Sequence, residues 1–389
     1  MNMFHLNRLH LATVSFGLAL TSLSCSNHAT APTEQSPFTY VSPYAWTTSD
    51  PASTGIDTVL FQTALDNLTS LPYVYSTLVV HDSLLIAEYY QGYLSKLNDY
   101  DIRSASKSFI SALMGIALQR GLIDSLGQRV YSFFPEFDTT GMDPRKREIT
   151  LRHLLTMRAG FDYSEGADYS AIFTPQANWV REILKFPLKY NPGERFYYST
   201  IQTHLLSVIL ARVSGMSTLE FAKKNLFDPL SIGIRAWYKD PQGYYYGGTG
   251  MNFTARDLAR FGYLYLRHGQ LNGTQIVPQS WITQTVQPQN STPLALGPFT
   301  NVNYGFSWWT ETNPSDSLFM ALGFACQIVM VAPGKDLVMV VTTNTDVASE
   351  AAADNQISAV AGIINQYLLP SVPAANPLVR AARRTSSGS

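Results

Sequence analysis

Apolar residues recur with helical spacing in the stretch that follows Phe109. Five of them fall at positions i, i+3, i+4, i+7 and i+8: Ile110, Leu113, Met114, Ala117 and Leu118. This is the stripe of an amphipathic helix that packs on a core, and Gly121 marks its end. Similar patterns predict further helices over 56–70, 150–157, 178–184, 205–211, 218–229, 254–266 and 351–368.

Strand patterns lie near the two ends of the chain. Residues 77–81 and 84–90 flank Asp82-Ser83 and predict a hairpin. After about residue 300 the helical spacing gives way to short apolar runs at 307–310, 319–322, 328–332 and 337–342. The economical arrangement is an α+β fold in which the N- and C-terminal parts share one antiparallel sheet flanked by helices. We expect an α/β lobe over 51–103 and 300–370, and a mainly helical second lobe over 104–299.

The two termini have the composition of segments outside the folded domain. Residues 1–25 contain a short apolar run before Leu23-Ser24-Cys25-Ser26 and resemble a lipoprotein-type signal peptide with Cys25 as the lipidated residue. A plain secretory signal is the alternative. Residues 26–50 are predicted to be a flexible tether and residues 371–389 a disordered tail. These features predict an exported protein, periplasmic or on the cell surface, that contacts a membrane only through its lipid.

Composition excludes several classes of function. The chain has 389 residues, 46% of them hydrophobic, and a formal net charge of −1, so nothing suggests a nucleic-acid partner. Its two cysteines cannot form a disulfide framework, and the seven histidines are scattered. We therefore predict neither a metal site nor a cofactor.

The candidate chemistry lies at the start of the helix that follows residue 103. Ser104 and Lys107 are three residues apart, so they share one helix face at an N-terminus whose unpaired N–H groups favour negative charge. A serine with a nearby amine and such a backbone meets two requirements of nucleophilic catalysis. The alternative is an ordinary N-cap serine followed by a first-turn lysine.

Four motifs in sequence order carry a family resemblance. They are Ser104-x-x-Lys107, the segments 151–160 and 192–199, and the Gly-rich loop and helix over 248–261. Together they resemble the penicillin-recognising serine hydrolases, which include penicillin-binding proteins, β-lactamases, related esterases and 6-aminohexanoate-dimer hydrolases. The match covers about residues 55–368. It implies a β-lactamase/transpeptidase-like fold and a catalytic Ser104 with Lys107 beside it.

The resemblance also assigns the rest of the site. The family's Tyr-x-Asn signature falls on Tyr198-Ser199-Thr200, so Tyr198 is the implied third catalytic residue, and its phenolate, favoured by a nearby ammonium, could relay a proton. The Lys-Thr-Gly signature falls on Ala321-Leu322-Gly323, where only the glycine matches. The N–H groups of Ser104 and Phe324 are the implied oxyanion hole. The residues expected to bind substrate are Gly323, Leu322, Thr200 and Tyr163.

The departure at Ala321 and Leu322 narrows the expected substrate. In the family this position helps to hold a substrate carboxylate, and here it has no cation. The sequence therefore favours a serine hydrolase that acts on an ester or small amide, like the carboxylesterases and 6-aminohexanoate-dimer hydrolases. The alternatives are a β-lactamase or D-Ala-D-Ala peptidase activity, or a lipoprotein that binds penicillin or a cell-wall ligand without turnover.

Overall fold

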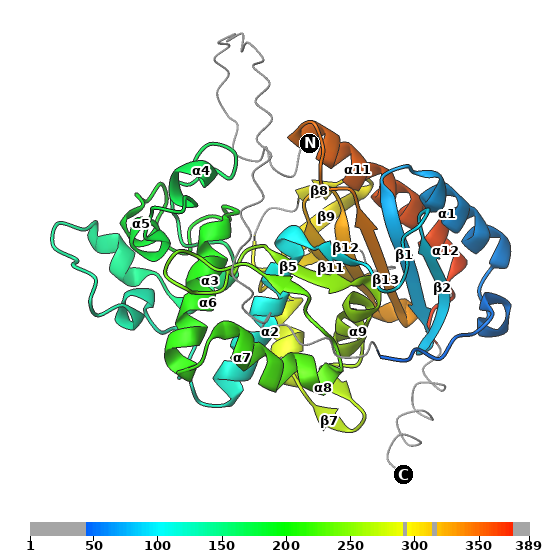
Figure 1. The fold of residues 1–389 in the computed structure, drawn as a ribbon, viewed down its shortest axis with the longest axis horizontal. Helices are drawn as coiled ribbons and strands as arrows, with labels where there is room; N and C mark the ends of the chain where they lie inside the picture. Colours follow the sequence, from blue (N-terminus) through cyan, green and yellow to red (C-terminus); the bar gives the residue numbers. More distant parts are fainter. Residues whose placement is uncertain (1–43, 291–293, 313–316, 376–389) are drawn as a thin grey trace, which may run out of the picture.

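The computed structural model describes residues 44–290, 294–312 and 317–375. The predicted signal peptide with Cys25, most of the tether and the end of the tail lie outside these residues. An antiparallel sheet runs through the molecule in the strand order β2-β1-β13-β12-β11-β10-β9-β8 (Figure 1). Its strands are β1 (Val74–His81), β2 (Leu84–Tyr90), β8 (Leu294–Leu296), β9 (Phe299–Tyr304), β10 (Trp309–Glu311), β11 (Leu318–Gly323), β12 (Gln327–Ala332) and β13 (Leu337–Thr343).

The sheet joins the two ends of the chain, as the sequence predicts. β1 pairs with β13, and Leu78 lies opposite Val340. The central strands are fully buried because both of their faces are covered. Alternate residues point to opposite faces of a strand, so Met339 packs in one core cluster while Val338 and Val340 pack in the other.

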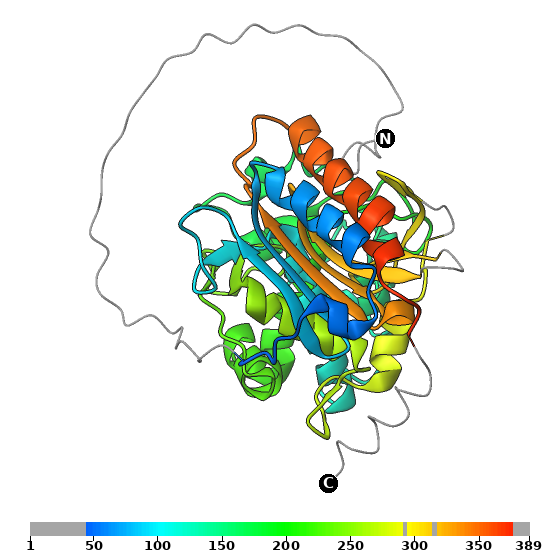
Figure 2. The ribbon, with the colours of Figure 1, turned by 90° about the vertical axis from the view of Figure 1, so that its right-hand side faces the viewer.

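Helices cover the two faces of the sheet. Figure 2 shows α1 (Thr58–Ser70) beside α11 (Glu350–Ile363), which continues through Ile364–Leu368 into α12 (Leu369–Ser371), over one face. α9 (Ala255–Leu266) packs on the other face, against β1, β12 and β13. The predicted helical lobe over 104–299 therefore needs a correction, because α9 belongs to the sheet. Its glycine, Gly262, allows close packing, since a Cβ there would lie 2.6 Å from Val338.

The second lobe consists mainly of short helices. Its elements are α3 (Leu151–Leu155), α4 (Tyr169–Ile172), α5 (Trp179–Lys185), α6 (Thr200–Ser214), α7 (Thr218–Ala222) and α8 (Asp228–Leu230). A small sheet in the order β3-β5-β4 is formed by Asp99–Asp101, Met251–Thr254 and Ala236–Trp237. No single helix in the described ranges is long and apolar enough to span a membrane. α6 and Thr218–Leu230 meet that test only as a pair, with a bend of 80° between them.

The helix α2 (Ser106–Gln119) occupies the centre of the molecule (Figure 1). Every residue from Ser106 to Ala117 is buried, on all sides of the helix. One side contacts α6 of the helical lobe and another contacts β11 of the sheet. The start of α2 therefore lies where the two lobes meet, as expected from the order of the predicted elements.

Both ends of the folded unit extend beyond the predicted boundaries. Trp46 is buried, and Leu85 of β2 donates a backbone hydrogen bond to Thr47 at 2.9 Å and accepts one from Ser49 at 3.2 Å, so this end of the predicted tether is attached to the sheet. At the other end, Lys335 donates to the carbonyl of Val372 at 2.9 Å. The predicted tail therefore starts too early, because residues 371–375 pack on the turn between β12 and β13.

Candidate active site

Ser104 lies in a 3₁₀ turn (Arg103–Ala105) that leads directly into α2. Its Oγ accepts a hydrogen bond from Lys107 Nζ at 2.9 Å, so the two side chains meet as their spacing predicts. Lys107 is only 1% exposed, whereas Ser104 is half-buried. Ser104 is therefore partly open to solvent, while Lys107 is enclosed.

The turn before Ser104 holds an unusual backbone conformation. Arg103 has φ 49°, in the left-handed region that non-glycine residues rarely adopt. Its N–H donates to Asp101 Oδ1 at 2.9 Å, and its guanidinium donates to Thr345 Oγ1 at 2.9 Å. These contacts hold a conformation that would otherwise cost free energy, a feature often found at functional sites.

Lys107 reaches across to two other segments. Besides Ser104, its ammonium donates to Thr200 Oγ1 at 3.1 Å and to the carbonyl of Gly248 at 2.8 Å. All three acceptors are neutral, so they replace the lost water around the ammonium without adding the attraction of a negative charge. Burial accordingly lowers the pKa of Lys107 to about 8, although Glu165 acts in the opposite direction. The amine is thus partly neutral near physiological pH and can accept a proton.

Tyr198 lies beside this pair. Its ring centroid is 5.0 Å from Lys107 Nζ, and the Ser104 side chain is close enough to its phenol to lower the pKa of that group. The ring stacks on Trp309 at 5.7 Å and meets Tyr304 edge-on. Burial, followed by the charge of Glu165, raises the pKa of Tyr198 well above its ordinary value. Burial at this position therefore favours the neutral phenol over the phenolate.

The predicted substrate-binding residues do not all face the site. The Thr200 hydroxyl accepts a hydrogen bond from Lys107, and its methyl group packs on Gly248. Leu322 is buried in the core cluster shared with α1 and α11, so only its backbone could meet a substrate. Tyr163 is fully buried with its ring against Phe186 at 5.7 Å.

Gly323 and Phe324 lie at the turn between β11 and β12. A Cβ on Gly323 would lie 2.2 Å from the carbonyl oxygen of Ile102, so the glycine lets the strand end press against the turn that carries Ser104. Phe324 follows directly, next to this contact. Cys326 is fully buried, and burial raises the pKa of its thiol, so it is a packed residue and not a nucleophile.

Glu165 lies beside Thr200 in the site, although the sequence analysis gave it no role. Its Oε1 accepts a hydrogen bond from the backbone N–H of Thr200. The residue is half-buried, and desolvation raises the pKa of its carboxyl while Lys107 acts to lower it. The polar loop around residue 165 is visible in the sequence, but no spacing links it to a helix that begins 35 residues later.

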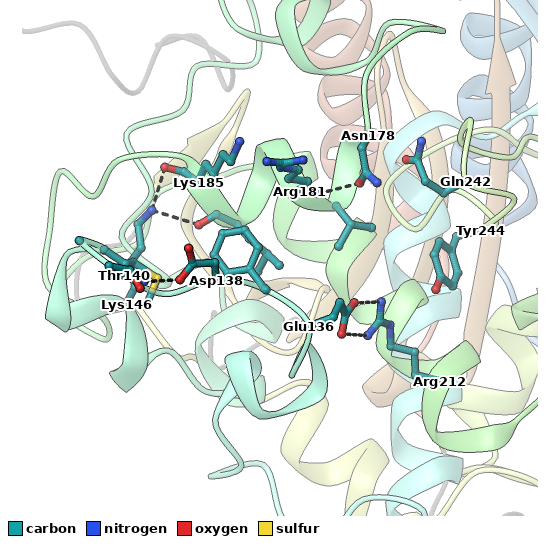
Figure 3. A pocket seen from close by; sticks show the side chains of 15 residues that line it. Glu136, Asp138, Thr140, Lys146, Asn178, Arg181, Lys185, Arg212, Gln242 and Tyr244 are labelled. Atoms are coloured by element: carbon teal, nitrogen blue, oxygen red, sulfur yellow. Dashed lines mark hydrogen bonds and ion pairs between the residues drawn. The ribbon is translucent and has the colours of Figure 1, made fainter.

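A hollow of about 760 Å³ opens elsewhere, on the helical lobe (Figure 3). None of the predicted site residues lines it. Arg212 at its wall pairs with Glu136 at 2.6 Å, and Lys146 donates to the carbonyls of Leu184 and Lys185. The described part of the chain also contains no group of three or more His, Cys, Asp or Glu side chains placed to hold a metal ion.

Comparison with known proteins gives the family and the fold of the chain. The chain is 27% identical over 279 residues to the 6-aminohexanoate-dimer hydrolase of Paenarthrobacter ureafaciens, covering 68% of this chain and 70% of that one. Its fold is similar to a candidate 6-aminohexanoate-dimer hydrolase of Bacillus anthracis, with TM-score 0.66, 21% identity and coverage of 85% and 89%. It is also similar to EstCE1, a hydrolase with promiscuous acyltransferase activity, with TM-score 0.63, 18% identity and coverage of 79% and 97%. The family model Beta-lactamase matches residues 98–362, so the chain belongs to the beta-lactamase family.

Proposed function

We propose that this protein is a serine hydrolase that cleaves an ester or a small amide through an acyl-enzyme at Ser104. One observation carries the proposal: Lys107 Nζ lies 2.9 Å from Ser104 Oγ in a buried setting whose hydrogen-bond acceptors are all neutral. A buried amine with a lowered pKa can act as a general base near neutral pH. The similarity to a 6-aminohexanoate-dimer hydrolase and to EstCE1 supports the same reaction class.

Acylation begins with proton transfer from Ser104 Oγ to neutral Lys107. The oxygen attacks the substrate carbonyl carbon, a C–O bond forms, and the carbonyl oxygen becomes an oxyanion. The backbone N–H groups of Ser104 and Phe324 are proposed to stabilise that charge. As the tetrahedral intermediate collapses, the proton passes through the neutral phenol of Tyr198 to the leaving alcohol or amine, which departs.

Deacylation uses water in place of the leaving group. Lys107, neutral again, accepts a proton from the attacking water, with Tyr198 as relay. The ester bond to Ser104 breaks, its Oγ regains a proton, and the acid is released. The sum of the two half-reactions is hydrolysis of one ester or amide bond, and the enzyme returns to its starting state.

The side chains at the Lys-Thr-Gly position, Ala321 and Leu322, favour a substrate that places no carboxylate there. Ala321 and Leu322 are both apolar and buried, so β11 supplies no cation at this position. Thr200, which stands where the family has an amide side chain, is committed to Lys107. We therefore favour neutral esters and small amides over penicillins or D-Ala-D-Ala peptides.

The test combines covalent labelling with a substrate panel. Wild-type protein, Ser104→Ala and Ser106→Ala would be treated with a fluorophosphonate and weighed by intact-protein mass spectrometry. Ser106 is a matched control because it is two residues away, at the first position of α2, and its hydroxyl is buried. We expect labelling and p-nitrophenyl ester hydrolysis in the wild type and Ser106→Ala, and loss of both in Ser104→Ala. Wild-type hydrolysis by Ser104→Ala would show the assignment to be wrong.

The same panel separates the alternatives. It would include p-nitrophenyl esters, 6-aminohexanoate dimer, D-amino-acid amides and a chromogenic cephalosporin. Turnover of the esters or the dimer supports the proposal. Turnover confined to the cephalosporin or the D-amino-acid amides would favour the β-lactamase or peptidase alternative. A protein that gains no mass from the fluorophosphonate would be a non-catalytic binder.

A further inference from the structure

The start of α6 is capped from a distant part of the chain. Its N-cap residue, Ser199, makes no capping hydrogen bond with its side chain, and Ser199 Oγ is buried with no partner among the described residues. The first helical N–H, on Thr200, donates instead to Glu165 Oε1. A carboxylate suits this place because helix N-termini present unpaired N–H groups and favour negative charge.

The capped segment carries two contacts of the proposed reaction. Tyr198 precedes the cap residue by one position, and its ring lies 5.0 Å from Lys107 Nζ. Thr200 accepts the hydrogen bond from Lys107 at 3.1 Å. A side chain that fixes the backbone at Thr200 therefore fixes the phenol on one side and the acceptor of the amine on the other.

The Glu165 carboxylate also changes the pKa values of Lys107 and Tyr198. It favours the ammonium form of Lys107 and disfavours ionisation of Tyr198. The other titratable groups that act on Glu165, or are acted on by it, come from several segments: Tyr163, Tyr169, Tyr246, Lys107 and Tyr198. Two further charges border this loop. Glu350 lies next to Gly166, where a Cβ would be 3.2 Å from Glu350 Oε1. Near Tyr169, Arg103 lowers and Asp101 raises the pKa of the phenol.

We propose that Glu165 is a positioning residue of the catalytic centre, which anchors the start of α6 and supplies the negative charge that faces Lys107. The inference rests on the proposed function, since it assumes that Lys107 is the base. Glu165 itself touches no reacting atom in this scheme. It acts through Thr200, Tyr198 and Lys107.

Two substitutions separate the two roles of Glu165. Glu165→Gln keeps an oxygen that can accept from Thr200 N–H but removes the charge. We expect its maximal kcat/KM to stay within about threefold of wild type, because the anchor remains. The acidic limb of the pH profile of kcat/KM should move to lower pH by about half a unit or more, because Lys107 loses a nearby negative charge. Glu165→Ala loses the anchor as well, and we expect kcat to fall at least about tenfold at every pH.

Asp168→Asn is the matched control. It removes one charge from the same loop, where Asp168 Oδ2 accepts from Ser164 N–H at 2.8 Å, and we expect a wild-type profile. Melting temperature and fluorophosphonate stoichiometry would correct each variant for its folded, active fraction. A Glu165→Gln profile that superimposes on wild type, or an alanine variant with full kcat, would overturn the inference. If Ser104→Ala stayed active, the proposed function would fail instead, so the two failures are distinguishable.

Discussion

Lys107 is a buried amine whose three hydrogen-bond partners are neutral oxygens, so the pH dependence of catalysis should report its protonation. Its pKa is lowered to about 8, chiefly by burial. Because the neutral amine is the proposed base, kcat/KM for a neutral ester should rise with pH and level off above about pH 8. The measurement is a pH–rate profile with an ester whose own groups do not titrate. A profile flat from pH 6 to 10 would argue against Lys107 as the base.

The same lysine should make the protein less stable than it could be. Its folded-state pKa lies below the unfolded value, so burying the charged form costs stability fully below about pH 8, and the cost fades as pH rises toward 10.5. Lys107→Met should therefore raise the free energy of unfolding by about 1–3 kcal/mol at pH 6–7. Chemical denaturation at pH 7 and pH 10 tests this, and the gain should shrink at the higher pH. A destabilised variant at pH 7 would contradict the expectation.

At the residue scale, contacts between residues close in the sequence could be predicted, but contacts between distant residues could not. Ser104 and Lys107 meet because three residues make nearly one helical turn. Tyr198 could be placed only through the family resemblance, since nothing in its own neighbourhood points to Ser104. Glu165 could not be placed at all, because its partner Thr200 is brought to it by tertiary packing.

At the scale of elements, the contact between the end of β11 and the turn before α2 can be tested. Gly323→Ala would place a methyl group 2.2 Å from the Ile102 carbonyl, so the strand end or the nucleophile turn must shift. We expect at least about a tenfold loss of kcat/KM, with a stability cost of about 1–3 kcal/mol.

Gly334→Ala is the control for that substitution. Gly334 lies in the turn between β12 and β13, where a Cβ would meet no atom within 4 Å. It should leave activity and melting temperature close to wild type. If Gly323→Ala behaved in the same way, the close packing at Ile102 would not be what positions Ser104.

Long periodic elements were predictable and short ones were not. The hairpin of β1 and β2, the helix α2 and the strands β11 to β13 follow from apolar runs, because burial and sequence pattern agree there. β3, β4 and β5 have three, two and four residues, too few for a period to be visible. The place of α9 on the sheet was also hidden, since a helix pattern does not say which layer the helix joins.

At the scale of the whole molecule, one aromatic residue ties the two lobes together. Phe109 of α2 is fully buried and stacks on Phe253 of β5 at 4.7 Å and on Phe261 of α9 at 3.7 Å. It also meets Phe227 of the helical lobe edge-on. A helix buried on all sides leaves neither lobe a complete core of its own, so the lobes should unfold together even in a chain of this size.

Phe109→Ala tests this coupling. Removing the ring should lower the free energy of unfolding by about 3–5 kcal/mol, because it leaves a cavity between the lobes. Far-UV circular dichroism and tryptophan fluorescence should still report one coincident transition, because Trp179 and Trp237 lie in the helical lobe and Trp308 lies next to the sheet. Tyr93→Ala is the control, since Tyr93 is 97% exposed and should leave the transition unchanged. Two separated transitions in the wild type would mean that α2 does not couple the lobes, and the junction that holds Ser104 would then be free to open.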